Sequence, residues 1–421
     1  MVRSRHKGAT VDIAPVLIAG GGPVGIITAL ALAARGIPVR VFEAEAAVND
    51  APRASTLHPA TLELLAQLGL LDEVIARGVV ARTFQFWDRP TRTLVAEFDH
   101  AILKDDTPWP FVVQCEQHKL ANIGIARLAG LRHAEVNFSS AVVSVVAAQD
   151  RVDITVERNG RRQTVSGSYL VGADGGRSLT RKSLGIAFEG YTFPERFLVL
   201  TTLFDFAAEH DVAYRAYFSD PDEWANLFKV AGDDGKGRWR AVFPTLPGQT
   251  DDEVLKAAAT EARLQRFFPK AGRYAIVHRN IYRVHQRVAA RFREGRVFLA
   301  GDAAHVNNPI GGLGLNCGVH DALHLAQALA AVLRGERPES ELARYDAVRR
   351  PANIEYVQQQ TIANKKRLEE KDAVSRQANL DNLRRTAADP AAHRAFLMRT
   401  SLLESVRKLA RDPEKWKPVF G

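Results

Sequence analysis

The chain has 421 residues, of which 46% are hydrophobic and 25% are charged, values that are ordinary for a globular protein. This length suffices for two or three domains, or one large interwoven one, with a core that can enclose a cofactor. The formal net charge of +9 comes from Lys and Arg spread along the chain, which favours a solvated basic surface or attraction of anionic small molecules. Nucleic-acid binding is not expected, because no basic run is interleaved with aromatic residues.

The two cysteines, Cys115 and Cys317, are too few for a disulfide framework, which favours a reducing, cytoplasmic setting. Residues 14–34 have the length and low charge of a membrane span or signal peptide, and basic residues precede them. Glycines and a proline interrupt this segment, so a strand, a glycine turn and a helix explain it better. We therefore expect no membrane span.

The predicted elements begin with a loose tail over 1–13 and a βαβ unit made of strand 15–19, helix 24–34 and strand 37–43. Further elements follow in chain order: helices 60–70 and 71–77, strands within 83–98 around a turn at 88–91, strand 111–114, a helix to about 129, and short strands between 136 and 171. Asn159-Gly160 is a strong hairpin signal within the last group.

The second half of the chain changes character along its length. Residues 188–282 are mostly strand-like, apart from a helix near 253–267, and 296–300 is another buried strand. From Asn316 onward the pattern is helical almost to the end, with interruptions expected near Pro338, Pro351 and Pro390. This helical tail is most simply a packed and solvated cap.

A glycine-rich turn lies between the first predicted strand and helix: residues 20–25 are Gly-Gly-Gly-Pro-Val-Gly. Gly20 allows the tight turn, Gly22 lets the backbone approach a pyrophosphate at the helix N-terminus, and Gly25 lets helix and strand pack closely. Glu43 ends the next strand, 23 residues after Gly20, where a carboxylate meets ribose hydroxyls. The pattern predicts a dinucleotide site; the alternative is a glycine turn that serves packing alone.

Two more polar turns follow apolar strands. In the first, glycines flank Asp174, which indicates backbone close to a polar ligand, although a hairpin end with a capping aspartate explains it equally well. In the second, Gly301 and Asp302 end a strand, and a glycine-rich turn over 308–316 leads into a long helix. Asp302 can hydrogen-bond a sugar-like chain, and the turn brings backbone N–H groups and a helix N-terminus up to a ligand.

These three motifs, in this order and spacing, resemble those of the single-component FAD-dependent aromatic hydroxylases, the para-hydroxybenzoate hydroxylase-like flavin monooxygenases. The resemblance runs from Val16 to about Pro351. The resemblance implies hydroxylation of an electron-rich aromatic or N-heteroaromatic, phenol-like substrate. In that family FAD is reduced by NADPH or NADH, forms a C4a-hydroperoxide with O₂, and passes one oxygen atom to the ring.

The resemblance also implies residue roles. The ADP half of FAD would lie on the first glycine turn and Glu43, the ribityl chain near Gln114 and Asp302, and the flavin ring against residues 309–316, while Asp174 would serve FAD and NAD(P)H together. The expected cofactor-binding residues are Gly20, Gly22, Pro23, Gly25, Glu43, Arg53, Gln114, Asp174, Gly301, Asp302, Gly312, Gly314, Leu315 and Asn316. The sequence departs from the family at Leu313 and Leu315, where glutamine and methionine are common.

Candidate catalytic residues are Pro309, Gly311 and Gly312 beside the flavin ring, with Tyr217 and Arg240 on the substrate side. A tyrosine could help deprotonate a phenol, and an arginine could hold a carboxylate or stabilise a phenolate; packing is the alternative for each. Further candidates are Tyr191, Tyr214, Trp224, Arg238, His58 and His305, the last more as scaffold. No Cys/His cluster indicates a metal.

The expected fold is therefore α/β: a Rossmann-type FAD-binding domain with a β-rich substrate domain inserted and a helical C-terminal region. The FAD-binding domain would take 1–187 and 283–350, the substrate domain 188–282, and the helical region 351–421. The expected partners are a small aromatic substrate, NAD(P)H and O₂, with homodimerisation left open.

Three alternatives remain at this stage. A flavin-dependent halogenase of similar fold would carry a Trp-x-Trp-x-Ile-Pro string, which is absent from the sequence. A nicotinamide-dependent dehydrogenase would not explain the Gly301-Asp302 motif. A non-catalytic FAD-binding protein, with the basic helical tail as its contact surface, would keep every motif.

Overall fold

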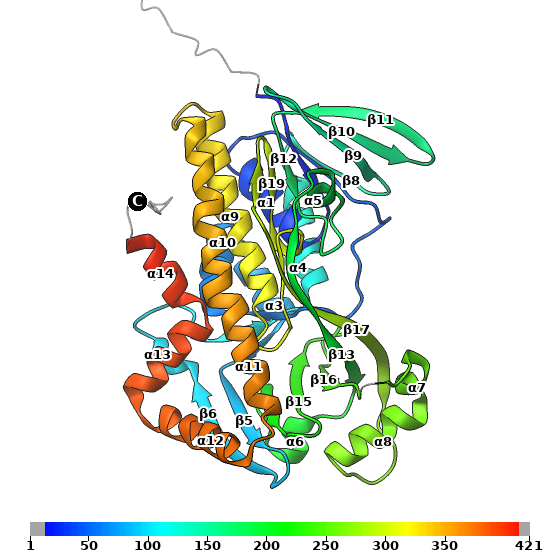
Figure 1. Ribbon diagram of the computed structural model, residues 1–421, viewed down its shortest axis with the longest axis vertical. Coiled ribbons are helices and arrows are strands. Elements are labelled where there is room, and N and C mark those ends of the chain that lie inside the picture. Colours follow the sequence, from blue (N-terminus) through cyan, green and yellow to red (C-terminus); the bar gives the residue numbers. More distant parts are fainter. Residues whose placement is uncertain (1–12, 247, 412–421) are drawn as a thin grey trace, which may run out of the picture.

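The protein, analysed as a computed structural model, is described over residues 13–246 and 248–411. Nearly all of the tail expected over 1–13 lies outside these ranges. Figure 1 shows the part that contains the N-terminal βαβ unit at the top and a broad sheet at the bottom. Long helices run along one side of both parts. Within the described ranges, no helix combines the length and apolarity that crossing a bilayer demands.

A six-stranded sheet forms the upper part. Its strands, in spatial order, are β18 (Arg293–Glu294), β19 (Val297–Leu299), β12 (Tyr169–Gly172), β1 (Val16–Ala19), β2 (Val39–Phe42) and β8 (Ala134–Asn137). All except β18 run parallel, so the carboxyl ends of β1, β2, β12 and β19 share one edge. The glycine turn, Glu43, Asp174 and Asp302 follow these four strands, and ligands bind at that edge in open α/β sheets.

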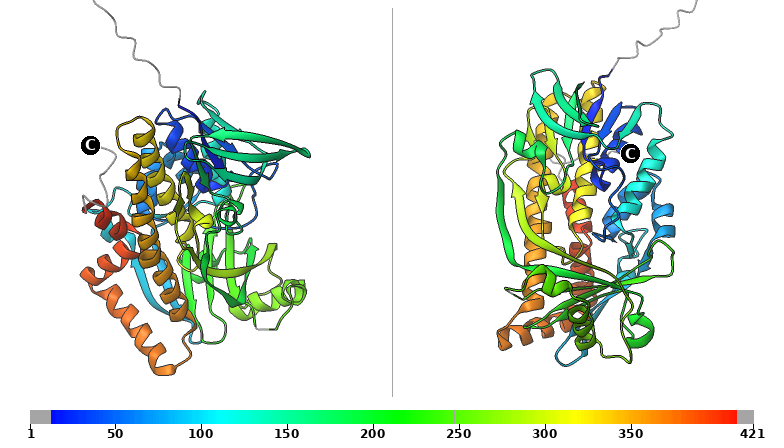
Figure 2. Two further views of the ribbon diagram at one scale, coloured as in Figure 1. Left: turned by 45° about the horizontal axis from the view of Figure 1, so that its top comes forward. Right: turned by 90° about the vertical axis from the view of Figure 1, so that its right-hand side faces the viewer.

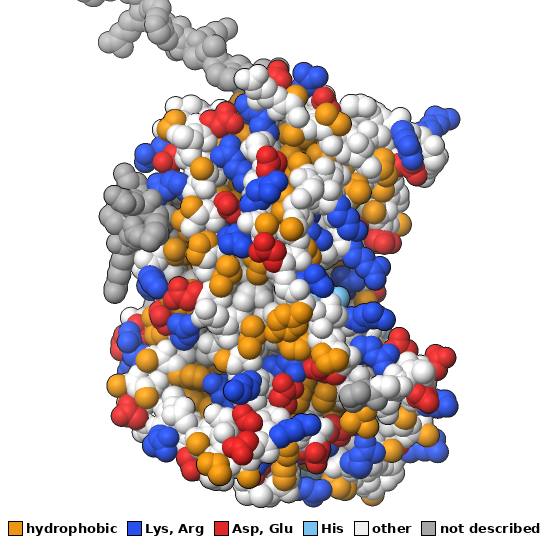
Figure 3. All heavy atoms as spheres, in the orientation of Figure 1, with side chains coloured by type: hydrophobic (Ala, Val, Ile, Leu, Met, Phe, Trp, Pro, Cys, Tyr) orange, Lys and Arg blue, Asp and Glu red, His pale blue; other side chains and the backbone are white. Residues whose placement is uncertain are grey.

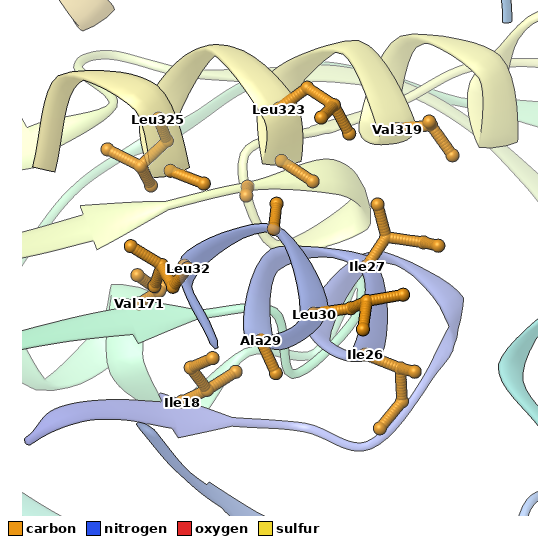
Figure 4. Packing of buried hydrophobic residues seen from close by; sticks show 14 of the residues in the cluster. Ile18, Ile26, Ile27, Ala29, Leu30, Leu32, Val171, Val319, Leu323 and Leu325 are labelled. Atoms are coloured by element: carbon orange, nitrogen blue, oxygen red, sulfur yellow. The ribbon is translucent and has the colours of Figure 1, made fainter. Parts of the chain in front are cut away.

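Helix α1 (Pro23–Ala33) is apolar on every side and is buried along most of its length, as a helix inside a core must be. It packs between the sheet and α9 (Gly314–Leu333). Figure 4 shows Ile18 on one side of α1 and Val319 and Leu323 of α9 on the other. Fully burying one such side chain contributes roughly 1.5–3 kcal/mol, so this contact fixes the glycine turn against the start of α9.

The lower part is an eight-stranded sheet in the order β20-β17-β13-β16-β15-β14-β5-β6. Its strands are β20 (His305–Val306), β17 (Ile276–Ala289), β13 (Phe188–Thr202), β16 (Arg238–Pro244), β15 (Ala225–Val230), β14 (Arg215–Ser219), β5 (Thr83–Asp88) and β6 (Thr93–Asp99). The expected segment 188–282 supplies most of this sheet, but β5 and β6 come from the region before it, and β17 continues past 282. The broad sheet is therefore wider than the sequence indicated.

The remaining elements are short strands and surface helices. Two three-stranded sheets are formed by β9 (Ala141–Ala147), β10 (Val152–Arg158) and β11 (Arg161–Gly167), and by β3 (Thr56–Leu57), β7 (Val112–Gln114) and β4 (Val79–Ala81). The helices before α9 are α2 (Pro59–Gln67), α3 (Leu71–Arg77), α4 (Gln117–Leu128), α5 (Leu179–Ser183), α6 (Phe206–His210), α7 (Asp251–Leu255) and α8 (Ala257–Phe267). The hairpin turn lies at Asn159 and Gly160, both with positive φ, as a type I′ turn requires.

The C-terminal helices are α10 (Ala343–Asn353), α11 (Gln359–Glu369), α12 (Ala373–Ala388), α13 (Pro390–Thr400) and α14 (Leu403–Arg411). Pro390 begins α13, as expected of a proline at a first helical position. The interruption expected at Pro351 is wrong: Pro351 lies inside α10, and the chain widens into a π-helical turn at Ile354–Gln358 instead of ending. Figure 2 shows the continuous α10–α11 rod running from the upper part down to the broad sheet, where α11 contacts β14.

Candidate active site

The first glycine turn has the geometry of a phosphate cradle. Gly20 has φ +105°, and a Cβ at Gly20 or Gly25 would collide with backbone carbonyl oxygens, so both positions need glycine. A Cβ at Gly22 would meet nothing within 4 Å. Gly22 is the N-cap of α1 and provides no side-chain cap. The first N–H groups of α1 therefore remain available to an anion.

Glu43 is held over this turn from the end of β2. Its Oε2 accepts a hydrogen bond from the Gly21 N–H over 2.6 Å, and its Oε1 accepts one from the Glu45 N–H over 2.9 Å. Each oxygen keeps a lone pair for a further donor. The carboxylate is thus oriented at the edge where ribose hydroxyls would arrive.

Asp174 and Gln114 each present a buried polar atom without a partner among the described residues. Asp174 Oδ2 accepts from the N–H and hydroxyl of Thr180, both over 2.9 Å, while its Oδ1 is unpaired. Gln114 Oε1 accepts from the Ser55 and Thr56 hydroxyls over 3.2 and 3.0 Å, while its Nε2 is unpaired. Buried polar atoms are rarely left unsatisfied, so both indicate a polar ligand.

Asp302 follows β19 at the same edge. Its side chain is exposed, yet the surrounding protein desolvates the carboxyl and raises its pKa, while His305 and Arg53 act in the opposite direction. Gly301 has φ +59° and donates its N–H to Asp321 Oδ2 over 3.1 Å. Arg181 donates to the carbonyl oxygens of Gly176 and Ala303 over 2.9 and 2.8 Å, which ties the second motif to the third.

A buried charged network lies beneath this third motif. His305 Nε2 is 2.6 Å from Asp321 Oδ2, and Arg349 Nε donates to Asp321 Oδ1 over 2.7 Å. Burial disfavours the imidazolium, but the nearby Cys317 and Asp321 raise the pKa of His305 to about 10. The side chains of His305, Cys317 and Asp321 lie close enough together to bind a metal ion. However, the positively charged guanidinium of Arg349 already donates hydrogen bonds to Cys317 and Asp321. His305 thus has the scaffold geometry that the sequence favoured for it.

The glycine-rich turn is fixed by Asn316, at the start of α9. The Asn316 amide donates to the carbonyl oxygens of Thr56 and Gly312 over 2.8 and 2.5 Å, and its Oδ1 accepts from the His58 N–H over 2.8 Å. Its side chain is completely buried. With its polar atoms used in this way, Asn316 shapes the turn from behind.

A pocket opens on the other side of the turn. Its walls come from β5, β14, the turn, α11 and α13. The lining residues are Phe84, Phe86, Arg215, Tyr217, Ile310, Gly311, Leu313, Gln360, Asn364, Leu368, Phe396 and Thr400. The pocket is thus mainly aromatic and aliphatic, with few polar groups, as small-molecule sites are.

The candidate residues on the substrate side do not all lie at this pocket. Tyr217 lines the pocket, whereas Arg240 lies elsewhere and donates to the Arg53 carbonyl oxygen over 2.8 Å. Tyr191 and Tyr214 are exposed. Trp224 packs on Phe197, and Arg238 pairs with Asp234.

Sequence reasoning missed Arg215 and the contribution of the C-terminal helices. A signal for Arg215 existed, because residues two apart on a strand share a face and Tyr217 was already a candidate. No comparable signal marked Gln360, Asn364 or Phe396, which the sequence placed in a solvated cap.

The observed geometry fits FAD. A phosphate cradle, an oriented carboxylate and the unpaired atoms of Asp174 and Gln114 lie on segments that meet at one sheet edge. Gly311 belongs both to the glycine-rich turn and to the pocket wall, so a flavin ring on the turn would border the pocket.

Comparison with known proteins gives the same answer. The FAD binding domain family matches residues 13–360. The chain is 34% identical to para-nitrophenol 4-monooxygenase of Pseudomonas sp. (strain WBC-3), over 94% of this chain and 97% of that protein. It is 35% identical to 6-hydroxy-3-succinoylpyridine 3-monooxygenase of Pseudomonas putida, over 84% of this chain and 88% of that one.

Solved structures agree. The crystal structure of p-nitrophenol 4-monooxygenase from Pseudomonas putida superposes with a TM-score of 0.88 and 32% identity, covering 97% of this chain and 99% of that chain. These relatives confirm the expected fold class and FAD cofactor.

Proposed function

This chain belongs to the FAD-dependent aromatic hydroxylases, and from that membership we propose that it hydroxylates a small, single-ring phenol in the pocket beside Gly311. It is an FAD-dependent monooxygenase that uses NAD(P)H and O₂. The observation that carries the finer proposal is the position of Gly311, which belongs both to the glycine-rich turn and to the wall of a pocket lined mainly by aromatic and aliphatic side chains. The halogenase alternative is not favoured by the relatives.

When bound, FAD would supply the redox chemistry by which NAD(P)H and O₂ serve the hydroxylation. The chain supplies binding, orientation and exclusion of water. The N-terminus of α1 and Glu43 would hold the ADP half, and Asp302 and Gln114 the ribityl chain. Buried Ile310 and Leu313 line the pocket beside the turn, which keeps water from the reacting atoms.

Tyr217 is placed to donate a hydrogen bond to a substrate oxygen. Its hydroxyl oxygen accepts from Arg215 Nε over 2.9 Å, which leaves its own hydrogen free to point elsewhere. Gln360 and Asn364 of α11 add amide groups to the pocket wall. The pocket can therefore orient an oxygen-bearing ring against the turn.

The reduced pyridine nucleotide would dock outside the pocket, near Asp174. Arg177 and Arg283 are exposed and have no ion pair among the described residues. His285 lies near both: burial and then Arg287, Arg283 and Arg177 lower the pKa of its imidazole. Lys and Arg side chains also line the indentation on the right of Figure 3. The basic cluster formed by Arg177 and Arg283 suits the pyrophosphate of a pyridine nucleotide.

The test is substrate-stimulated NAD(P)H oxidation by the FAD-loaded protein. With NADH and NADPH in parallel, a panel of single-ring phenols and hydroxypyridines should include compounds that accelerate oxidation and yield a hydroxylated product. Two-ring and larger phenols should not. No hydroxylated product with any compound would contradict the proposal, and NAD(P)H oxidation no faster than the background rate would favour a non-catalytic FAD-binding protein.

Two further predictions concern context. A cytoplasmic location is supported by the two cysteines, which form no disulfide and are both buried. Homodimerisation is the other, and sedimentation of the FAD-loaded protein measures it directly.

A further inference from the structure

Three successive carbonyl oxygens of the glycine-rich turn, at residues 310–312, accept hydrogen bonds from separate parts of the chain. The second oxygen accepts from His58 before α2 and from Arg215 of β14, and the third accepts from Asn316 of α9. The first oxygen accepts from Asn364 Nδ2 of α11 over 3.2 Å. Each of these peptides is therefore held from outside the turn, the first by a residue that also lines the pocket.

The contact with α11 determines which way the Ile310–Gly311 peptide faces. In a planar trans peptide the carbonyl oxygen and the following N–H point in opposite directions, so the Gly311 N–H is directed away from α11. Within residues 13–246 and 248–411, that N–H donates no hydrogen bond. The Gly312 N–H, in contrast, is used inside the turn, where it donates to the Pro309 carbonyl oxygen over 2.9 Å. The Gly311 N–H is thus available to a ligand.

This peptide needs a side chain to hold it, because a glycine follows its carbonyl. Gly311 has φ +108°, and a Cβ there would lie only 2.8 Å from Asn364 Nδ2. The missing side chain lets the amide approach closely, and it also lets the backbone rotate at low cost. Without the donor from α11, the Ile310 oxygen can turn away from the helix, and the Gly311 N–H would then no longer face a ligand.

Asn364 is itself held in the orientation that donates to the turn. Its Oδ1 accepts from Gln360 Nε2 over 2.9 Å and from Arg367 over 3.4 Å. Because an amide oxygen only accepts, these two donors leave Nδ2 on the side of the turn. The helix is anchored one residue further on, where Lys365, only 5% exposed, pairs with Glu195 of β13 over 2.6 Å. The position of the amide is therefore set by α11 and its anchor.

We propose that Asn364 is a positioning residue for the flavin ring: it fixes the direction of the Ile310–Gly311 peptide so that the Gly311 N–H donates to the bound cofactor. This inference rests on the proposed function, which puts the ring along the turn, and adds a residue of α11 that acts through the backbone. Hydrogen bonds to charged acceptors are stronger than those to neutral ones. The donor therefore favours the negatively charged reduced cofactor over the neutral ring of oxidised FAD.

The first measurement observes the Gly311 N–H directly in the FAD-loaded wild-type protein. The dipeptide Ile-Gly occurs only twice in the sequence, at residues 123–124 and 310–311. With ¹³C at isoleucine carbonyls and ¹⁵N at glycines, an NMR spectrum that correlates each amide with the preceding carbonyl therefore contains two signals. Gly124 lies inside α4 and is the internal control. We expect the Gly311 amide to exchange with D₂O much more slowly than an unprotected backbone amide.

Two substitutions then remove the donor with little change in size. Asn364→Leu takes the donor away, and Asn364→Asp places a carboxylate against the Ile310 oxygen, which repels it. In both FAD-loaded variants we expect Gly311 exchange to be at least tenfold faster, with Gly124 unchanged. The reduced cofactor should be disfavoured about 3- to 10-fold, which lowers the two-electron potential by roughly 15–30 mV. Gln359→Leu, which replaces an exposed amide of the same helix, should match the wild type in both measurements.

A Gly311 amide that exchanges at the unprotected rate in the FAD-loaded wild-type protein would overturn the inference without any variant. So would an Asn364→Leu protein with wild-type exchange and potential, or an equal change in Gln359→Leu. Hydroxylation is followed separately. Its persistence beside an unprotected Gly311 amide would leave the proposed function standing, whereas its absence with every phenol would overturn that function and not the role of Asn364.

Discussion

His58 Nε2 lies 2.8 Å from the carbonyl oxygen of Gly311, which joins the segment before α2 to the glycine-rich turn. A carbonyl only accepts, so Nε2 carries the hydrogen, and Nδ1 is buried without a partner. Burial, followed by the charge of Arg215, holds the pKa of this imidazole well below its usual range. The imidazole is therefore neutral. Its hydrogen bond to Gly311 acts as a clamp that holds the turn in place, and the ring does not serve as a proton donor or acceptor in the reaction.

Removing this clamp should loosen the turn. We expect His58→Asn to retain FAD but to lower kcat by roughly 2- to 10-fold, since a neutral hydrogen bond contributes about 0.5–1.5 kcal/mol. More hydrogen peroxide should form per NAD(P)H, because a looser turn admits water. Peroxide and product are measured in one assay, with His118→Asn, whose imidazole lies 3.5 Å from Asp233 and does not contact the turn, as control. Equal coupling in both variants would remove His58 from this role.

The phosphate cradle makes a second prediction. Gly22→Val places a branched side chain in the open space before α1, and FAD binding should be abolished. Glu43→Ala loses hydrogen bonds to a charged acceptor, about 1.5–3 kcal/mol, and should weaken FAD binding roughly 10- to 100-fold. Equilibrium dialysis against FAD measures both, with the surface Glu135→Ala as control. Wild-type affinity in Gly22→Val would mean that the phosphates lie elsewhere.

The network beneath Gly301 should give stability a pH dependence. The pKa of His305 is raised from an ordinary value of 6.5 to about 10, so the unfolded chain loses this proton first as pH rises. The His305–Asp321 pair therefore stabilises fully below pH 6.5, and its contribution is lost toward pH 10.

We expect His305→Gln to be less stable than the wild type by about 3–5 kcal/mol at pH 6, because Asp321 loses a buried partner. The difference should shrink steadily toward pH 10. Urea unfolding at several pH values measures it. A constant difference across the range would show that His305 is not charged in the folded protein.

The basic cluster near Asp174 should affect the binding of the pyridine nucleotide and not that of FAD or the phenol. Replacing Arg177 and Arg283 with Gln should raise KM for NAD(P)H several-fold and weaken its dependence on salt, because charge attraction is screened by ions. FAD affinity and KM for the phenol should stay unchanged. An unaltered KM for both nucleotides would place the docking site elsewhere.

The gathering of the cofactor-binding candidates at one sheet edge was predictable because each of their motifs is local. Gly20, Gly22 and Gly25 lie within one turn, and Glu43, Asp174 and Asp302 each directly follow an apolar strand. Parallel strands then bring these ends together at one edge, so a correct assignment of strands was sufficient.

The pocket beside Gly311 was not predictable in the same way. Arg240 and Arg215 both lie in strands, but Arg215 reaches the turn because β14 pairs with β5 on one side and β15 on the other. That strand order depends on contacts between distant segments. Gln360 and Asn364 reach the pocket only because α10 continues through Pro351, which local rules for proline argue against.

Isotope transfer from O₂ tests the central claim most directly. The FAD-loaded protein is turned over with NAD(P)H and a phenol that stimulates oxidation, under ¹⁸O₂ in ordinary water, and the product is weighed by mass spectrometry. The account predicts one ¹⁸O atom in each hydroxylated product and reducing equivalents largely matched by product. A product that takes its oxygen from water, or consumption of O₂ that ends entirely in hydrogen peroxide, would contradict it.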